Sequence, residues 1–404
     1  MRTPLRPLGL YIHIPFCRQK CAYCDFYSLS GQEGRMDDYT AALCTHLAET
    51  ASAASCHTVD TVYFGGGTPS LLGEKRLVKI FKTIQKKYRL AKDPEITLEA
   101  NPESAGDWKT LRALRRAGFN RLSLGMQSAG SQNLLTLGRI HTAAETRAAV
   151  EAARKAGFDN LSLDLIYGLP GQTLEHWQED LAAAEDLVPE HLSCYGLQVE
   201  EGTPLHARRD TLDLPGDGAQ AEMYLWTVED LARHGYRQYE ISNFAKPGRE
   251  SRHNLKYWTL AEYAGFGPSA HSDFGDTRYA YGRDLEGYIR GVREHAPLLS
   301  ESERIPALER DTEWIMLRCR TAEGLDPKEF ERRFRRRFSC LAAVLAACRD
   351  AGYAVEEPDG RWHLTPQGFL LSNQIIGRLL DALTEEKRRR AEAAARGDFR
   401  VVLE

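Results

Sequence analysis

Three cysteines lie within eight residues near the start of the chain, in the stretch CRQKCAYC. They are Cys17, Cys21 and Cys24, in the spacing C-x3-C-x2-C, and no fourth cysteine stands beside them. A structural zinc ion usually takes four protein ligands, commonly as two spaced pairs. A disulfide framework needs an even number of cysteines in a small secreted chain. Neither description fits this stretch, so its chemistry depends on what else the chain contains.

The composition is that of an ordinary globular protein. With 404 residues the chain exceeds the roughly 250–300 at which a single core stops growing, which predicts one large domain and a smaller one. A net charge of −4 gives no general attraction to nucleic acids or anionic membranes. Nine scattered cysteines indicate a reducing compartment, where the other six are expected to be small buried hydrophobes. The apolar stretch LGLYIHIPF is too short for a membrane span, so we expect a cytoplasmic protein.

A repeat shows how the chain is organised. AGFNRLSLGMQ at 117–127 and AGFDNLSLDLI at 156–166 align with an offset of 39 residues, and each joins the end of a helix to a short apolar strand. Similar strands begin near Gly9, Thr61, Glu95 and His191, and helical patterns lie between them, such as those from Glu74 and Leu174. Six strands that alternate with helices predict an α/β fold with a parallel sheet and right-handed crossovers. Periodicity alone leaves open whether the sheet is doubly wound or curled into a barrel.

Unusual residues gather at the ends of these predicted strands. In a barrel, chemistry is found at the C-terminal ends of the strands. The thiol cluster follows the first strand, and GGGTP at 65–69 follows the second. The later strands carry polar residues at or near their ends, namely Glu99, Asn101, Gln127 and Asp164. We therefore expect one functional site at this end of the sheet.

Three motifs in this order carry a resemblance to a known family. YIHIPFCRQKCAYCDF, YFGGGTPSLL and DLIYGLPGQT resemble the radical SAM superfamily, in particular its coproporphyrinogen oxidase-like branch. The resemblance runs from about Leu10 to LTPQGFLLSNQII near the C-terminus. It implies a partial (β/α)6 TIM-like barrel and a [4Fe–4S] cluster held by Cys17, Cys21 and Cys24. In this superfamily S-adenosylmethionine binds the iron that the three thiolates leave without a protein ligand.

The resemblance also implies contacts to S-adenosylmethionine. The glycine run at 65–67 could be no more than a tight strand-to-helix turn. The carboxylates in the apolar strands could be exposed at the strand ends, although a buried carboxylate needs a partner. His13 is expected to be a satisfied core histidine. The implied cosubstrate contacts are Tyr11, Tyr23, Gly66, Gly67, Thr68, Glu99, Gln127, Arg139 and Asp164.

Two departures separate the chain from the coproporphyrinogen oxidases themselves. Those enzymes carry a fourth cysteine two residues after the third, where this chain has Phe26, and they have a long N-terminal arm, whereas 16 residues precede Cys17 here. Both features match the shorter HemW-type heme chaperones of the same branch. HNLKYW at 253–258 also resembles the H-N-x-x-Y-W heme-binding motif of that group. A neutral imidazole is a common axial ligand of heme iron, and in a helix His253 and Tyr257 would share one face. The alternative is a lone histidine in a packed, aromatic-rich loop.

The resemblance implies a protein that binds heme, a [4Fe–4S] cluster and S-adenosylmethionine, and that delivers heme to apo-hemoproteins. Peripheral association with membrane hemoproteins is a further expectation. The alternative is an enzyme, either an oxygen-independent coproporphyrinogen III oxidase (a radical SAM decarboxylase) or another tetrapyrrole-acting radical SAM enzyme. No catalytic residue is assigned on either interpretation.

The end of the chain predicts a smaller module. Two helical patterns precede a hairpin that turns at Asp359-Gly360, which suggests a winged-helix-like arrangement. The basic run Arg332–Arg337 could contact DNA or form a solvated helix face, and the acidic net charge favours a protein without a nucleic-acid partner. We expect a barrel core with the cluster loop at 1–240, a heme-motif segment at 241–296, the C-terminal module at 297–383 and a charged tail at 384–404.

Overall fold

The computed structural model describes residues 5–396. The chain forms two compact units. The core unit contains the chain up to Arg237 together with Ser242–Lys256 and Ala261–Glu303. The C-terminal unit contains Gln238–Ile241, Tyr257–Leu260 and the chain from Arg304 onward. The boundary between them therefore crosses the segment that carries the HNLKYW motif.

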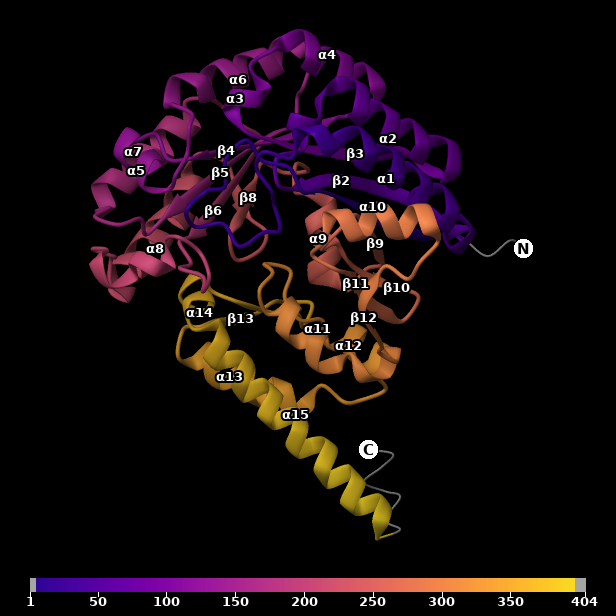
Figure 1. Cartoon of the computed structure of the whole chain (residues 1–404). Helices are drawn as coiled ribbons and strands as arrows, with labels where there is room; N and C mark the ends of the chain where they lie inside the picture. Colours follow the sequence, from indigo (N-terminus) through magenta and orange to yellow (C-terminus); the bar gives the residue numbers. More distant parts are fainter. Residues whose placement is uncertain (1–4, 397–404) are drawn as a thin grey trace. The chain divides into compact units, whose positions relative to one another are not determined.

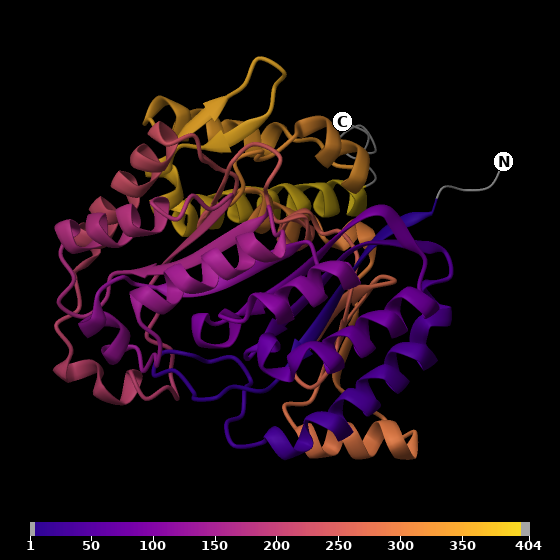
Figure 2. The ribbon, with the colours of Figure 1, turned by 90° about the horizontal axis from the view of Figure 1, so that it is seen from above.

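Six parallel strands in consecutive order form the centre of the core unit, as the repeat predicts. Helices follow the strands and form an arc around their outer side (Figures 1 and 2). The edge strands β1 and β6 pair with further strands rather than with each other, so the barrel stays open. This is the partial (β/α)6 barrel that the resemblance implied. The strands are β1 (Arg6–Ile14), β2 (His57–Gly66), β3 (Leu90–Ala100), β4 (Arg121–Gln127), β5 (Leu161–Tyr167) and β6 (His191–Gly196).

The helices of the arc pack through apolar faces on the outer side of the strands. α2 buries Leu77, Ile80, Phe81 and Ile84, which recur at helical spacing, and its other face carries lysines. The helices are α1 (Met36–Thr50), α2 (Gly73–Lys87), α4 (Trp108–Ala117), α6 (Ala143–Ala156), α7 (Leu174–Glu185) and α8 (Asp217–Arg233), with the short α3 (Pro102–Ala105) and α5 (Ser131–Thr136) between them.

The AGF repeat marks the ends of two of these helices. α4 ends at Gly118 (φ 123°) and α6 at Gly157 (φ 96°), conformations that favour glycine. The next residue in each case is a buried phenylalanine, Phe119 or Phe158, whose N–H bonds back to the helix at 3.1 Å. The repeat is therefore a helix stop followed by an anchor that directs the chain into β4 or β5.

Side chains alternate along the strands between the helices and the barrel interior. On β4, Leu122 and Leu124 join the hydrophobic core under the helices, while Arg121 and Ser123 belong to the other face. The same alternation puts polar residues on the inner face of the other strands, including Thr61, Glu95, Thr97, Ser162, His191 and Ser193, all buried. The interior of the barrel is thus polar, although each strand appears apolar as a whole.

The rest of the core unit extends the sheet on both sides. β9 (Tyr263–Phe266) pairs parallel with β1, and β10 (His271–Phe274), β11 (Thr277–Tyr281) and β12 (Leu299–Arg304) continue beyond it. At the other edge β8 (Asn243–Ala245) runs antiparallel to β6, followed by β7 (Arg237–Gln238). α9 (Arg252–Thr259) and α10 (Leu285–Glu294) lie between these strands in sequence, and α10 packs against α1.

The C-terminal unit has the two predicted helices and the predicted hairpin. α12 ends at Phe334, and Phe334 and Phe338 pack inward against Phe330, as expected for a helix face interrupted by aromatic residues. Arg336 of the basic run pairs with the buried Asp311 at 2.9 Å. Its elements are α11 (Asp311–Arg318), α12 (Pro327–Phe334), α13 (Ser339–Asp350), β13 (Ala354–Glu356), β14 (Trp362–Leu364), α14 (Pro366–Leu370) and α15 (Ser372–Ala395).

Two further expectations can be compared with this structure. The predicted tail at 384–404 begins within α15, and its residues 397–404 lie outside the described part of the chain. Of the six remaining cysteines, which were expected to be buried, Cys194, Cys319 and Cys348 are buried and Cys44 and Cys340 are half-buried. The expectation is wrong for Cys56, which is exposed. No helix within residues 5–396 is both long and apolar enough to cross a membrane.

Candidate functional site

The three thiols lie on the loop between β1 and α1, at the C-terminal end of the strands. Cys17 N–H donates to the carbonyl of Leu29 (2.9 Å), which closes the loop. Ala22 holds its middle, because its N–H donates to Leu137 O (2.9 Å) and its carbonyl accepts from Leu205 N–H (2.8 Å). Later parts of the chain thus fix the loop. Cys17, Cys21 and Cys24 are half-buried, and none of them forms a disulfide.

The surroundings of the thiols suit a metal cluster. Thr68 Oγ1 donates to Cys17 Sγ (3.5 Å), and Arg139 Nη1 donates to Cys21 Sγ (3.4 Å). Burial raises the pKa of the Cys17 and Cys24 thiols. These two thiols are therefore protonated at neutral pH when no metal is bound, whereas a coordinated metal deprotonates its thiol ligands outright. A hydroxyl donor and a guanidinium cation beside the sulfurs then stabilise the resulting thiolates.

Asn101 links the groups that contact the two sulfurs. Its Nδ2 donates to Thr68 Oγ1 (3.1 Å), and its Oδ1 accepts from Arg139 Nη1 (3.2 Å). Arg139 Nη2 in turn donates to the carbonyl of Gly125 on β4 (3.1 Å). The sequence marked Asn101 only as the end of a strand. Asn101 follows the strand that carries Glu99, and a polar amide at this strand end was the feature that could have indicated its role.

The glycine run after β2 packs directly on the thiol loop. Gly67 N–H donates to Ile14 O (2.8 Å), and Thr68 N–H donates to Phe16 O (2.7 Å). A Cβ on Gly67 would lie 2.7 Å from Phe16 O and 2.8 Å from Ile14 O, and Gly66 has φ 110°. The glycine run is therefore a tight turn and also a place where two backbone segments approach closely. Only glycine allows the two loops to pair here.

Two carboxylates enter the barrel interior from β3 and β5, the strands on either side of β4. Glu99 accepts from Tyr63 OH (2.7 Å) and from Gly66 N–H (3.2 Å), and burial raises its pKa to about 7. Asp164 accepts from Ser123 Oγ (3.2 Å), and burial also raises its pKa. The serine hydrogen bonds oppose that rise. Both groups have partners inside the barrel, and Glu99 can carry a proton near neutral pH.

A buried arginine faces this pair and was not assigned from the sequence. Arg121, at the start of β4, is buried, and its positive charge opposes the rise in the pKa of both Glu99 and Asp164. An arginine at the first position of a strand is usually exposed. Arg121 lies two residues before Ser123, on the same inner face of the strand, and this spacing was the feature that could have indicated its burial.

The remaining predicted cosubstrate residues lie at the same end of the barrel. Tyr11 stacks on Tyr63 with ring centroids 6.3 Å apart. Tyr23, on the thiol loop, packs against a small apolar cluster that includes Leu137, and its burial raises its pKa. Gln127 is buried and has φ 63° at the end of β4.

His13 is the satisfied core histidine that the sequence predicted. Its Nδ1 is hydrogen-bonded to Tyr11 OH (3.1 Å) and its Nε2 to Tyr27 O (2.8 Å), and the residue is 3% exposed. Burial lowers the pKa of His13 to about 4, so the ring is neutral. It helps to orient Tyr11 and is not a spare ligand.

The predicted heme histidine lies toward the other end of the barrel. His253 is 0% exposed, with Nδ1 hydrogen-bonded to Thr61 Oγ1 (2.8 Å) and its ring stacked on Tyr63 (5.2 Å). Thr61 precedes Tyr63 and Gly65 on the inner face of β2, so His253 faces the N-terminal half of the strands, away from the thiol loop. Burial lowers the pKa of His253 to about 3, which keeps the imidazole neutral.

The helix that carries His253 is firmly attached to the core unit. The stretch is helical, so His253 and Tyr257 are one turn apart on α9, as considered for the motif. Glu95 caps the start of α9, because its carboxylate accepts from Arg252 N–H (3.1 Å) and His253 N–H (3.0 Å). Lys256 pairs with Asp60 at 2.7 Å. Tyr257 is half-buried and belongs by its contacts to the C-terminal unit.

Comparison with known proteins first defines the class. Residues 11–184 match the radical SAM superfamily, and residues 305–371 match the HemN C-terminal domain. The solved structure of coproporphyrinogen III oxidase (HemN) from Escherichia coli, titled a radical SAM enzyme, is similar with a TM-score of 0.81 and 26% identity, over 94% of this chain and 91% of that one. The thiol loop and glycine turn therefore belong to a radical SAM protein, a class whose cofactors are a [4Fe–4S] cluster and S-adenosylmethionine.

The full-length relatives then define the family. The chain is 37% identical over 377 residues to the heme chaperone HemW of Bacillus subtilis, covering 92% of this chain and 99% of that protein. It is 36% identical over 389 residues to the heme chaperone HemW of Escherichia coli strain K12, covering 92% and 98%. The chain belongs to the HemW family, as the Phe26 position and the HNLKYW motif indicated.

Proposed function

We propose that this protein is a heme chaperone that binds heme, together with a cluster and S-adenosylmethionine, and delivers the heme to apo-hemoproteins. The observation that carries the proposal is the similarity to proteins named heme chaperones over nearly their whole length, 99% in one case. Coproporphyrinogen III oxidation is not favoured, because the similarity to that enzyme is lower, at 26% identity. Phe26 is 69% exposed beside the thiol loop and offers no ligand.

In this proposal the C-terminal end of the barrel holds the cluster and the cosubstrate. Cys17, Cys21 and Cys24 hold the cluster, which with S-adenosylmethionine supplies one-electron chemistry when bound. Thr68, Asn101 and Arg139 keep the sulfurs in place and balance their charge. We expect the methionine part of the cosubstrate to bind beside the glycine turn. Its hydroxyls and amines would meet Glu99 and Asp164, whose charge is balanced by Arg121 inside the barrel.

Heme binding by His253 and Tyr257 would require a change of conformation. The ring of His253 is enclosed in this conformation, so ligation of heme iron requires α9 to loosen from the barrel. The contacts that hold that segment include the Thr61 hydrogen bond, the Glu95 cap, the Lys256–Asp60 ion pair and the stacking of the His253 ring on Tyr63. Heme uptake would then exchange these contacts for an iron–imidazole bond. A cytoplasmic location and peripheral contact with membrane hemoproteins are also part of this proposal.

The function is tested by following heme transfer. The reconstituted protein is loaded with hemin and mixed with increasing amounts of a heme-stripped b-type cytochrome, and the Soret band reports transfer. Direct delivery predicts a rate that rises with acceptor concentration, because the two proteins must meet. Passive release predicts a rate that does not depend on the acceptor. Apomyoglobin, which captures released heme, measures the rate of passive release. A transfer rate that equals this value and does not depend on acceptor concentration would contradict the chaperone function.

A further inference from the structure

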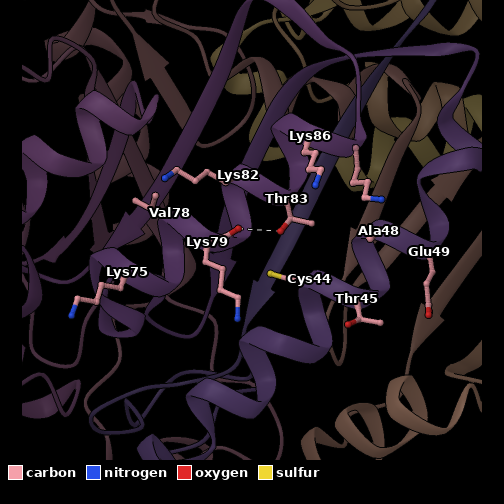
Figure 3. Close-up of a pocket in the computed structure, with 11 residues that line it drawn as sticks. Cys44, Thr45, Ala48, Glu49, Lys75, Val78, Lys79, Lys82, Thr83 and Lys86 are labelled. Atoms are coloured by element: carbon pink, nitrogen blue, oxygen red, sulfur yellow. Dashed lines mark hydrogen bonds between the residues drawn. The ribbon is translucent and has the colours of Figure 1, made fainter.

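A groove of about 650 Å³ lies between α1 and α2, away from the barrel interior (Figure 3). From α1 it is lined by Cys44, Thr45, Ala48 and Glu49, so its α1 side consists largely of small side chains. From α2 it is lined by Val78, Thr83 and five lysines, namely Lys75, Lys79, Lys82, Lys86 and Lys87. We refer to these five residues as the lysine row.

The lysine row follows one face of α2. The intervals between its members are four, three, four and one residues, which is helical spacing over a length of about 18 Å. The opposite face of the same helix is buried in the hydrophobic core. The row is thus held in place by packing that does not involve the lysines.

The lysine row has few acidic partners within the described residues. All five lysines are exposed, and none forms an ion pair within residues 5–396, whereas the adjacent Arg76 pairs with Asp37 at 2.7 Å. Glu49, the one acidic residue of the groove lining, lies 3.4 Å from His295. Like charges one turn apart, such as Lys75 with Lys79 and Lys82 with Lys86, destabilise a helix. This repulsion is local, because the net charge of the chain is −4.

A nucleic acid, an anionic membrane or an acidic protein could each relieve this repulsion, and the lining residues distinguish between them. The groove has no aromatic side chain on which a base could stack and no arginine to grip a phosphate with two bonds. It also has no bulky apolar side chain that could enter a bilayer. What remains is a hollow between two helices with a small-residue wall and a cationic wall. This shape and charge fit a third helix that carries carboxylates on one face.

We propose that the groove between α1 and α2 docks an acidic helix of a partner protein, with carboxylates at positions i, i+4, i+7 and i+11 opposite the lysine row. The attraction acts across an exposed surface, so it is screened by salt. It supplies orientation and association rate more than affinity. The proposal concerns a surface separate from the cluster site and does not depend on heme binding.

The first test measures the binding of a synthetic peptide to the full-length reconstituted protein. The peptide is an 18-residue labelled helix with glutamates at those four spacings, and its control has the same composition with glutamates spread around the helix. Fluorescence anisotropy should show tighter binding of the first peptide, weakened as salt rises from 0.05 to 0.3 M. Lys79→Glu/Lys82→Glu/Lys86→Glu should lower the affinity at least tenfold. Equal binding of both peptides, or an unchanged affinity of this variant, would overturn the proposal.

A matched charge change elsewhere controls for net charge. Lys109→Glu/Arg147→Glu/Lys328→Glu alters three exposed residues that do not line the groove, and it should change the affinity less than threefold. A tenfold loss in this control variant would mean that overall charge, and not the groove, attracts the peptide. Circular dichroism melting curves of both variants show whether they fold like the parent protein.

The second test uses two cysteines of this chain as reporters. Cys44 lines the groove, whereas Cys56 is exposed and does not line it. The acidic helix should slow the alkylation of Cys44 by N-ethylmaleimide and leave Cys56 unchanged, as read by tandem mass spectrometry. Absence of protection at Cys44 would contradict the proposed position. Protection by phosphatidylglycerol vesicles, without protection by the peptide, would replace the partner helix with a membrane surface.

Discussion

Two of the three thiols accept hydrogen bonds from different parts of the barrel. Cys17 accepts a hydrogen bond from Thr68, which follows β2, and Cys21 accepts one from Arg139, which follows α5. Asn101, at the end of β3, joins the two donors. The loop is thus a site only when the sheet has formed, because three strand ends must meet to surround it. This explains why a short motif in a loop can hold a defined cluster.

Replacement of any one of Cys17, Cys21 and Cys24 by alanine should abolish the cluster. Anaerobic reconstitution of the parent protein should give about four irons per chain and broad absorption near roughly 400 nm, as thiolate-bound clusters do. Iron content and visible absorption check the result. Cys319→Ala is the control, because that cysteine is buried in the C-terminal unit and should leave the spectrum unchanged. A fully functional protein that contains zinc and no iron would contradict this assignment.

Glu99→Gln and Asp164→Asn should each weaken the binding of S-adenosylmethionine without unfolding the chain. Each change removes a charged hydrogen-bond partner, which costs about 1.5–3 kcal/mol, or roughly a tenfold to a hundredfold loss of affinity. Isothermal titration calorimetry of the cluster-loaded variants measures this loss. If the affinity of both variants equals that of the parent protein, the two carboxylates serve structure alone.

Glu99 should also make the stability of the protein depend on pH. Burial raises its pKa to about 7, above the usual 4.5, so the folded protein holds a proton that the unfolded chain has lost. The free energy of unfolding therefore falls as the pH rises from about 4.5 to 7. Glu99→Gln should remove this part of the decrease. Urea unfolding of the cluster-free parent protein and of Glu99→Gln at pH 5 and pH 7.5 measures how the free energy of unfolding changes with pH in each. An identical change in both proteins would show that Glu99 is ionised throughout.

At the scale of secondary structure, α9 is the element whose position matters most for the heme proposal. Its first N–H groups donate to Glu95, a buried carboxylate on β3. An acidic cap satisfies free N–H groups at a helix start and interacts favourably with the helix dipole. α9 is therefore a separate element attached to the barrel by a few polar contacts, and those contacts can be weakened one at a time.

Glu95→Gln should loosen α9 and speed heme uptake. The loss of a charged cap costs about 0.5–2 kcal/mol, which should raise hydrogen exchange at the α9 amides and increase the observed rate of hemin binding severalfold. Stopped-flow Soret absorption and exchange mass spectrometry measure the two effects. Asp107→Asn is the matched control, because Asp107 caps α4 in the same way through Lys109 and Thr110. Faster exchange in α9 without faster uptake would mean that α9 does not control access of heme.

Much of the architecture follows from local sequence patterns, and the reason lies in particular elements. β1 to β6 could be predicted because their outward-facing residues are consistently apolar and because the glycine of each AGF repeat ends a helix. β7 to β12 were not predicted, because most are short strands that add to the edges of an existing sheet. The site was predicted at strand ends, and Asn101 was noted there. Arg121 and the contacts of Asn101 were missed because they arise from neighbours distant in sequence. The enclosure of His253 was missed for the same reason, since it depends on Thr61 and Tyr63.

At the scale of the whole molecule, the groove is separate from the barrel interior, whereas the proposed cosubstrate and heme residues adjoin at Tyr63, which donates to Glu99 and stacks on His253. The cluster loop lies at the C-terminal end of the strands, and His253 faces their N-terminal half. The groove with the lysine row lies outside the barrel, between α1 and α2. Loss of the lysine row therefore need not affect the residues inside the barrel. A His253 variant should keep its cluster, since no thiol contacts that histidine in the described hydrogen-bond network.

The most direct test of heme binding through His253 is a hemin titration of the parent protein and of His253→Ala, with coproporphyrinogen III turnover measured in parallel. The parent protein should give a saturable Soret band, and His253→Ala should shift that band or lower its stoichiometry while the iron–sulfur absorption stays unchanged. Loss of the imidazole leaves the heme iron with a different ligand or none, whereas Tyr257→Phe retains an aromatic surface and should have a smaller effect. Heme binding that does not depend on His253, together with consumption of coproporphyrinogen III and release of carbon dioxide, would contradict the proposed function.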